Sequence, residues 1–190
     1  MRETGPVTAN RGGPTGDPDG DLPGNKNPTA GKPSTPFSAM LTFHVNEPAH
    51  LDAFIALNEA WITEYFELEE GDRRLAADPG AIARSGGVVI SAIEDGEVVG
   101  VGAVVPLEDG VCDFIRFAVD PSRRSQGIGR QIINLAIEHA RAMGGKQLTL
   151  YTNTKLEAAQ SLYKSLGFVV THRGPHHEYR RPDLVMSLDL

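Results

Sequence analysis

The chain has 190 residues, enough for one domain with a substantial core. No apolar run approaches the roughly 18 residues that span a bilayer, which favours a soluble protein over a membrane protein. The net charge of −7 argues against a nucleic-acid-binding protein, because such binding relies on many Lys and Arg contacts to phosphate.

The single cysteine, Cys112, lies inside a predicted strand. One cysteine excludes an internal disulfide and a cysteine-based zinc site. We interpret it as a small buried hydrophobe in a reducing compartment, so we expect a cytoplasmic protein without a metal site.

The segment from Met1 to about Ser38 differs in composition from the rest. It holds seven of the 13 prolines and seven of the 21 glycines, and almost no large apolar residues. Such a segment cannot bury enough surface to offset its ordering entropy. We expect residues 1–38 to be a flexible tail and 39–190 to be one domain. The tail is read as a dispensable extension or, alternatively, as a partner-binding segment.

The domain is predicted to begin with a strand at Leu41–Val45, followed by Asn46 as a helix cap. Apolar residues at three- and four-residue spacing then predict a long amphipathic helix over Leu51–Leu68. A second helical stretch spans Asp72–Ala83 and is interrupted by Pro79-Gly80.

The pattern then changes to strands. Two β-branched runs, Gly87–Glu94 and Val98–Val105, flank Asp95-Gly96, a strong hairpin signal, and a third strand is predicted over Val111–Val119. The remaining elements are a helix at Ile128–Met143, a strand at Gln147–Tyr151, a helix at Leu156–Leu166, and strands at Phe168–Thr171 and Leu184–Leu188. The predicted order βααβββαβαββ is that of an α+β fold.

The stretch from Phe114 to Arg130 combines the end of a strand, a turn with two arginines and two glycines, and a helix start. Such a turn directs unpaired backbone N–H groups and the positive end of a helix dipole at one point. The sequence therefore predicts a phosphate or pyrophosphate site here.

Two phosphate-binding motifs do not fit. The dinucleotide motif Gly-x-Gly-x-x-Gly fails because Ile132 stands at its third glycine. The nucleotide P-loop fails at Gly144-Gly145-Lys146, where Ala140 replaces the first glycine and Gln147 replaces Ser or Thr.

What remains is Arg124-x-x-Gly127-x-Gly129, after a strand that ends in Ala118-Val119-Asp120-Pro121. Together with Leu162-Tyr163-Lys164-Ser165-Leu166-Gly167-Phe168 near the end, these residues make the chain, over about Leu41–Leu190, resemble the GNAT superfamily of N-acetyltransferases. The resemblance implies a mixed, mostly antiparallel sheet of about seven strands flanked by helices, with acetyl-coenzyme A as co-substrate.

The resemblance also implies a donor site. The pyrophosphate would bind the backbone N–H groups of about Gln126–Arg130, with Arg123, Arg124 or Arg130 meeting its charge. The pantetheine arm would lie where strand 111–119 parts from strand 147–151. The implied coenzyme-binding residues are Phe117, Ala118, Val119, Arg124, Ser125, Gln126, Gly127, Ile128, Gly129, Arg130 and Asn153.

For the chemistry, the resemblance places Tyr163 as the general acid that protonates the leaving thiolate. Asp113 on the central strand is the candidate base. Glu64, Glu67, His44 and water remain open as alternatives. The family often has Asn seven residues before this Tyr, where this chain has Leu156. Asn153 either takes over its contact to the arm or caps the helix.

The expected acceptor is a primary amine of a small molecule or amino acid, bound by a monomer or homodimer. Arg173, Arg180 and Arg181 of the last hairpin are candidates to bind an acceptor carboxylate. His176 and His177 lack acidic or sulfur partners at ligand spacing, which indicates a polar loop. The aromatic end of the first helix, formed by Trp61, Tyr65 and Phe66, is read as core or as pocket lining.

Two other functions remain open. A non-catalytic acetyl-coenzyme A sensor of the same fold would use the same turn without needing an acid at Tyr163. A structural partner protein whose turn binds only incidental anions would show no thermal shift with coenzyme A.

Overall fold

The structure is a computed structural model that describes residues 40–175 and 180–190. The predicted tail, residues 1–38, therefore lies outside the described residues, as do His176 and His177. Within the described ranges, no helix is long and apolar enough to cross a membrane.

Seven strands form one sheet in the order β1-β2-β3-β4-β5-β7-β6. Their bounds are β1 Thr42–Val45, β2 Val88–Glu94, β3 Glu97–Pro106, β4 Val111–Val119, β5 Gln147–Thr152, β6 Val169–Arg173 and β7 Leu184–Asp189. Neighbouring strands pair antiparallel except for β4 and β5, which are parallel. The predicted α+β class and mostly antiparallel sheet are confirmed.

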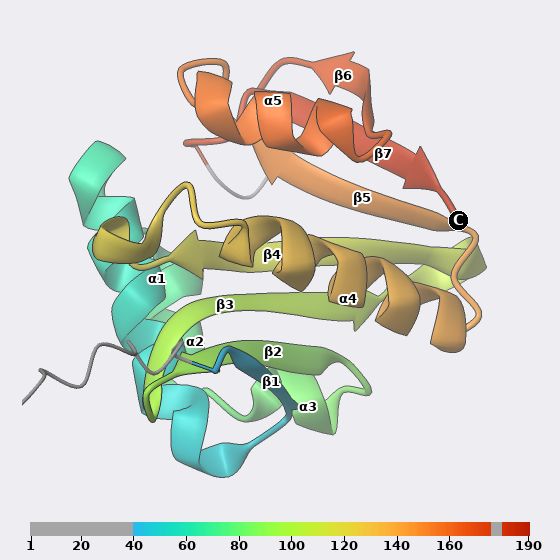
Figure 1. The fold of residues 1–190 in the computed structure, drawn as a ribbon. Coiled ribbons are helices and arrows are strands. Elements are labelled where there is room, and N and C mark those ends of the chain that lie inside the picture. Colours follow the sequence, from blue (N-terminus) through green and yellow to red (C-terminus); the bar gives the residue numbers. More distant parts are fainter. Residues whose placement is uncertain (1–39, 176–179) are drawn as a thin grey trace, which may run out of the picture. The chain divides into compact units, whose positions relative to one another are not determined.

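Helices cover both faces of the sheet (Figure 1). One hydrophobic core packs α4, Ile128–Ala142, and α5, Glu157–Ser165, against the sheet. A second core lies beneath α1, Leu51–Tyr65, and the short α3, Ala81–Arg84. The central strands β3 and β4 are thus buried from both sides, which explains their long apolar runs.

The helical stretch predicted over Asp72–Ala83 is interrupted near Pro79-Gly80, as expected. It consists of two helices, α2 at Glu70–Ala77 and α3 at Ala81–Arg84. The break falls at Asp78, whose φ of −144° is not helical, because the ring of a following proline disfavours helical backbone. The first long helix differs from the prediction, because it ends at Tyr65, three residues before its predicted end.

Asn46 does not cap a helix, so that prediction is wrong. Glu47 precedes the 3-10 turn Pro48–His50, and no side chain caps it. Asn46 instead adopts a left-handed φ of 53°, and its Oδ1 accepts a hydrogen bond from the Val89 N–H at 2.8 Å. Asn tolerates this conformation better than most residues, so it can fix the β1 end to β2.

Two glycines of β3 allow α4 to pack closely on the sheet. A Cβ built at Gly102 would lie 2.9 Å from Phe114 Cε2 and 3.0 Å from Ile132 Cγ2. A Cβ at Gly100 would lie 2.8 Å from Ile132 Cδ1. Ile132 of α4 can therefore approach the sheet this closely only because Gly100 and Gly102 have no side chains.

We expect Gly102→Ala to lower the free energy of unfolding by about 1–3 kcal/mol, because the added methyl overpacks a site already in contact. Urea unfolding monitored by circular dichroism measures this change. Glu138→Ala, on the exposed face of α4, is the control and should stay within about 0.5 kcal/mol of wild type. Equal stability of Gly102→Ala and wild type would contradict the packing argument.

Candidate active site

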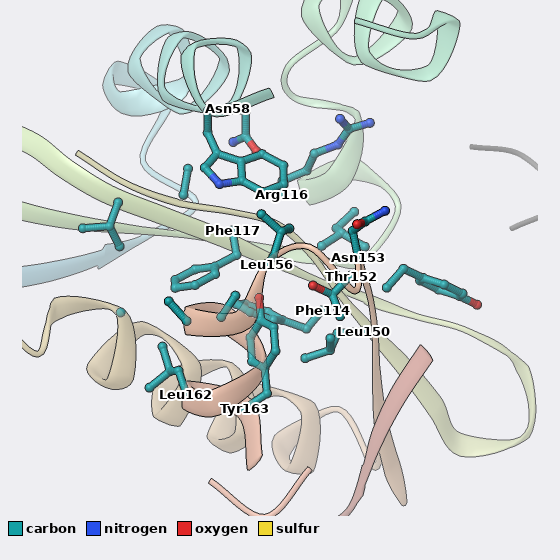
Figure 2. A pocket seen from close by; sticks show the side chains of 18 of the residues that line it. Asn58, Phe114, Arg116, Phe117, Leu150, Thr152, Asn153, Leu156, Leu162 and Tyr163 are labelled. Atoms are coloured by element: carbon teal, nitrogen blue, oxygen red, sulfur yellow. The ribbon is translucent and has the colours of Figure 1, made fainter. Parts of the chain in front are cut away.

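A cavity of about 1180 Å³ lies where α1, β4, the start of α4, the end of β5 and α5 meet. Figure 2 shows side chains that line it. Of the residues predicted to bind coenzyme A, all but Gln126 line this cavity, and so do Tyr163 and Asp113. The Gln126 side chain donates to the Ser122 carbonyl at 3.3 Å. The structure therefore gathers the predicted residues, which lie on four separate segments of the chain, around one cavity.

Strands β4 and β5 pair over only four residues each, from Val111–Gln147 to Phe114–Leu150. Beyond this point both strands continue but diverge (Figure 1). The β3–β4 register shifts between Val101 and Ala103, and Arg116 of β4 has a left-handed φ of 56° at this shift, as in a β-bulge. The bulge thus lies where the two strands part.

The backbone on the open side of β4 offers hydrogen-bond donors. The Asp120 N–H donates to the Val99 carbonyl of β3 at 2.9 Å. Because successive N–H groups of a strand point to opposite edges, those of Val119 and Phe117 point to the β5 side. Both N–H groups lie beyond the last β4–β5 pair. They could therefore donate hydrogen bonds to an extended ligand bound between the two strands.

The start of α4 presents a helix N-terminus to the same cavity. Gly127 precedes the helix with a left-handed φ of 83° and provides no side-chain cap. The Gln131 N–H is bonded to the Gly127 carbonyl, so the N–H groups of the first three helical residues have no partner within the helix. Gly129 packs against β4, since a Cβ there would lie 2.9 Å from Phe117 Cζ. This arrangement suits a phosphate.

The three arginines near this turn are all engaged by protein groups. Arg124 forms a bidentate ion pair with Glu64 of α1, at 2.6 Å and 3.0 Å. Arg123 pairs with Glu94, and Arg130 Nη2 donates to Ser165 Oγ at 2.8 Å. Hydrogen bonds from Arg124 and then Tyr65 lower the pKa of Glu64 to about 2. Glu64 is therefore ionised near neutral pH and compensates the Arg124 charge.

Tyr163 lies in α5 with 6% of its surface exposed. Its ring packs near Phe117 and Phe168, and Figure 2 shows the hydroxyl directed into the pocket. Within the described part of the chain no group hydrogen-bonds this hydroxyl. Burial raises the pKa of Tyr163 above its ordinary value, so the phenol remains protonated at neutral pH.

Asp113 lies on β4 and lines the cavity; its Oδ1 is buried without a hydrogen-bond partner among the described residues. Burial raises the pKa of Asp113 to about 6. Such a carboxylate is mostly ionised at pH 7.5 yet remains a proton acceptor. The alternatives Glu67 and His44 do not line the cavity, and Glu64 is paired with Arg124.

Asn153 does not cap α5. Its Oδ1 accepts from the Lys155 N–H at 2.9 Å and its Nδ2 donates to the Arg181 carbonyl at 2.5 Å, while Leu156 precedes the helix without a side-chain cap. Asn153 thus joins the loop after β5 to the segment before β7. It still lines the cavity, so its contact with the pantetheine arm stays a prediction.

The predicted arginine cluster of the last hairpin does not form at the cavity. Arg173 and Arg180 do not line it. Arg181 does, but its guanidinium bonds Asp72 of α2 at 2.6 Å and 2.7 Å. Arg181 and Asp72 are 109 residues apart in the sequence, so no local sequence pattern predicts their ion pair.

Asn58 and Arg116 are among the lining residues that were not predicted from the sequence. Asn58 is the polar member of the buried stripe Phe54, Asn58 and Ile62 of α1. A polar residue within an apolar helix face could have indicated from the sequence that Asn58 lines a cavity. Arg116, a charge within an apolar strand, lines the cavity because the bulge turns it there. Among the described residues, no group of His, Cys, Asp or Glu could hold a metal ion.

Curated relatives cover part of the chain. An uncharacterised N-acetyltransferase of Escherichia coli, YjgM, is 38% identical over 77 residues, which are 39% of this chain and 46% of that protein. The human N-acetylaspartate synthetase is 35% identical over 98 residues, which are 51% of this chain and 32% of that protein. The chain thus spans less than half the length of these relatives.

Solved structures share the fold more completely. A GNAT-family acetyltransferase of Staphylococcus aureus has a TM-score of 0.70 at 17% identity, over 80% of this chain and 99% of that one. A putative acetyltransferase of Salmonella typhimurium, yncA, solved with its cofactor acetyl-CoA, has a TM-score of 0.65 at 24% identity, over 80% and 95%. The profile of the acetyltransferase (GNAT) family matches residues 51–168. The chain belongs to the acetyltransferase (GNAT) family.

Proposed function

We propose that this protein is an N-acetyltransferase that moves the acetyl group of acetyl-CoA to a primary amine of a small molecule or amino acid. One observation carries the proposal. A single cavity joins the exposed start of α4, the divergence of β4 from β5, the Tyr163 hydroxyl and the Asp113 carboxylate. The solved relative that contains acetyl-CoA supports the choice of donor.

The donor site is built mainly from backbone. The N–H groups of Ile128, Gly129 and Arg130 would hold the pyrophosphate, aided by the helix dipole. The N–H groups of Phe117 and Val119 would bind the pantetheine arm and stabilise negative charge on the thioester oxygen. When bound, acetyl-CoA supplies an electrophilic carbonyl carbon and a thiolate leaving group.

Two side chains would then move the protons. As the bond from nitrogen to the acetyl carbon forms and the carbon–sulfur bond breaks, Asp113 accepts a proton from nitrogen, directly or through water. Tyr163 donates a proton to sulfur and regains one from solvent. Its raised pKa is no obstacle, because burial also raises the pKa of a thiol beside it.

The acceptor class rests on the chemistry of the remaining lining. The cavity exposes Asp113, Asn58 and Arg116 alongside aromatic side chains of α1, a mixture that suits a small polar amine. The relatedness to N-acetylaspartate synthetases favours an amino acid within that class.

We expect Tyr163→Phe to lower kcat about 100-fold, because a positioned general acid contributes on this order. Thiol release from acetyl-CoA with a panel of amines measures the rate. The dissociation constant of acetyl-CoA, measured by calorimetry, should stay close to wild type. If wild type binds acetyl-CoA tightly but turns over no amine, the protein is a sensor of this fold and the proposal fails.

We expect Asp113→Asn to reduce kcat/KM at pH 7.5. The activity of wild type should fall as pH decreases through about 6, because Asp113 accepts protons only when ionised. The activity of Asp113→Asn should not show this decrease. Initial rates from pH 5 to 8.5 measure this. A variant that keeps the wild-type rate and pH profile would exclude Asp113 as the base.

Asp113→Asn should lower activity but raise the free energy of unfolding. The folded chain holds the Asp113 proton up to about pH 6, whereas the unfolded chain releases it near 3.8, so wild-type stability falls as pH rises through this window. Asp113→Asn should therefore be more stable than wild type at pH 7.5, with a smaller advantage at pH 5. Asp109→Asn, an exposed loop carboxylate, is the matched control in urea unfolding and should show no such pH-dependent gain.

We expect Glu64→Gln to tighten acetyl-CoA binding about 2- to 10-fold, because Arg124 loses its compensating carboxylate and its charge can act on phosphate. Calorimetry at low ionic strength measures the dissociation constant. Glu67→Gln removes the same charge three residues away, at an exposed position outside the cavity. This variant controls for the effect of losing one negative charge anywhere near the site. Equal tightening by both variants, or weaker binding by Glu64→Gln, would contradict the role of this ion pair.

A further inference from the structure

Asp113 lies on the face of the sheet opposite to Tyr163. Its neighbours along β4, Cys112 and Phe114, belong with Tyr163 to the core that α4 and α5 cover. Because side chains of a strand alternate between the two faces, Asp113 lies on the other face, which bears α1. Figure 2 shows Asn58 of α1 at the opposite end of the pocket from Tyr163. The lining around Asp113 should therefore contact the acceptor rather than the coenzyme.

Apolar side chains of β3 and β4 surround Asp113 on this face. Val105 is its register partner on β3, and Ile115 lies two residues along β4; both pack on the core beneath α1. The Leu107 N–H donates to the Val111 carbonyl at 2.8 Å, so the antiparallel pairing continues past Val105. Leu107 therefore lies on the same face, diagonally next to Asp113.

Tyr151 adds an aromatic side chain from β5. The register partner of Asp113 on β5 is Thr149, and Tyr151 lies two residues further along, on the same face. Burial and then the charge of Asp113 raise the pKa of Tyr151, which indicates that the two side chains are close. We call the four neighbours of Asp113 that line the cavity the apolar wall: Val105, Leu107, Ile115 and Tyr151.

Two members of the apolar wall keep much of their surface exposed. Leu107 is 50% exposed and Tyr151 is 36% exposed, and both line the cavity. Leu107 also lies outside both of the described hydrophobic cores. Exposed apolar surface at a concave site is typical of ligand binding. The apolar wall is therefore available to pack against a bound molecule.

Asp113 is the polar group at the centre of this apolar surface. Its Oδ1 is buried and has no hydrogen-bond partner among the described residues. A buried acceptor atom without a partner is costly, and an N–H group from a ligand would remove that cost. The two features together suit a ligand with an amine at one end and an apolar body beside it.

We propose that the acceptor is a primary amine carried on a large apolar group, such as an aromatic ring. Its N–H group donates to Asp113, and its apolar body packs on the apolar wall. The inference rests on the proposed acetyltransferase function and names its acceptor class. It assigns Leu107 as a residue that determines acceptor specificity. The requirement concerns the apolar body, so it applies equally to an amino acid and to a simple amine.

The test uses two pairs of amines that differ by a ring. L-Phenylalanine is compared with L-alanine, and 2-phenylethylamine with ethylamine. Thiol release from acetyl-CoA is measured at equal concentrations of neutral amine, because the members of a pair differ in pKa. In wild type we expect kcat/KM for the ring compound to exceed that for its partner roughly 10- to 100-fold, as for burial of one large apolar side chain. Comparable values within both pairs would overturn the proposal without any variant.

The ratio of kcat/KM within a pair is then measured in variants. In Leu107→Asn it should fall roughly 3- to 10-fold, because the side chain keeps its approximate size but loses its apolar surface. Leu107→Met, which keeps an apolar side chain, should retain the ratio within about twofold. Val169→Asn, at an exposed apolar position of β6 outside the cavity, is the matched control and should keep the wild-type ratio. If Leu107→Asn weakens both members of a pair by the same factor, Leu107 is only structural and the proposal is wrong.

Two further outcomes separate this inference from the function on which it rests. Turnover of other amines but of neither ring compound would overturn the acceptor assignment and leave the acetyltransferase function intact. Binding of acetyl-CoA without turnover of any amine would overturn both. Thermal unfolding of each variant, monitored by circular dichroism, verifies that a changed ratio does not arise from a loss of folded protein.

Discussion

The end of β4–β5 pairing at Phe114 and Leu150 is the constraint on which the site depends. Both strands continue past this point, so backbone groups on their inner edges lose their partners, and buried backbone groups without partners are costly. An extended guest that hydrogen-bonds along β4 would satisfy them. The bulge at Arg116 lies where the strands part, and β3 and β4 are held from both faces by helices. The opening is therefore a feature of the sheet itself.

Ion pairs between distant segments hold the surroundings of this opening in place. Asp72 joins α2 to the bulge of β4 and to the segment before β7, through two guanidinium groups that keep its buried charge compensated. Arg124 joins the turn before α4 to the C-terminal end of α1. Because α1 carries the aromatic lining and α4 the exposed N–H groups, the second pair joins two elements that line the cavity.

Much of this could be predicted from local patterns. Periodicity identified the strands and the long helices, and Asp95-Gly96 identified the β2–β3 hairpin, because such signals depend on neighbours in sequence. The motif from Arg124 to Gly129 located the helix N-terminus correctly. Asn46 was misread because its side chain bonds Val89, 43 residues away. The interruption at Pro79-Gly80 was predicted because proline is a local signal, and the structure breaks the helical stretch at Asp78.

The sequence by itself determined the fold class, the start of a helix at Ile128 and the position of Tyr163 in a helix, since each follows from residue types at short spacing. Only the tertiary structure decided which arginines line the cavity. Arg181 is tied to Asp72 and Arg124 to Glu64, while Arg116 enters the lining through a backbone bulge. The physical reason is that an ion pair or a register shift depends on partners brought together by folding, and no local pattern encodes that proximity.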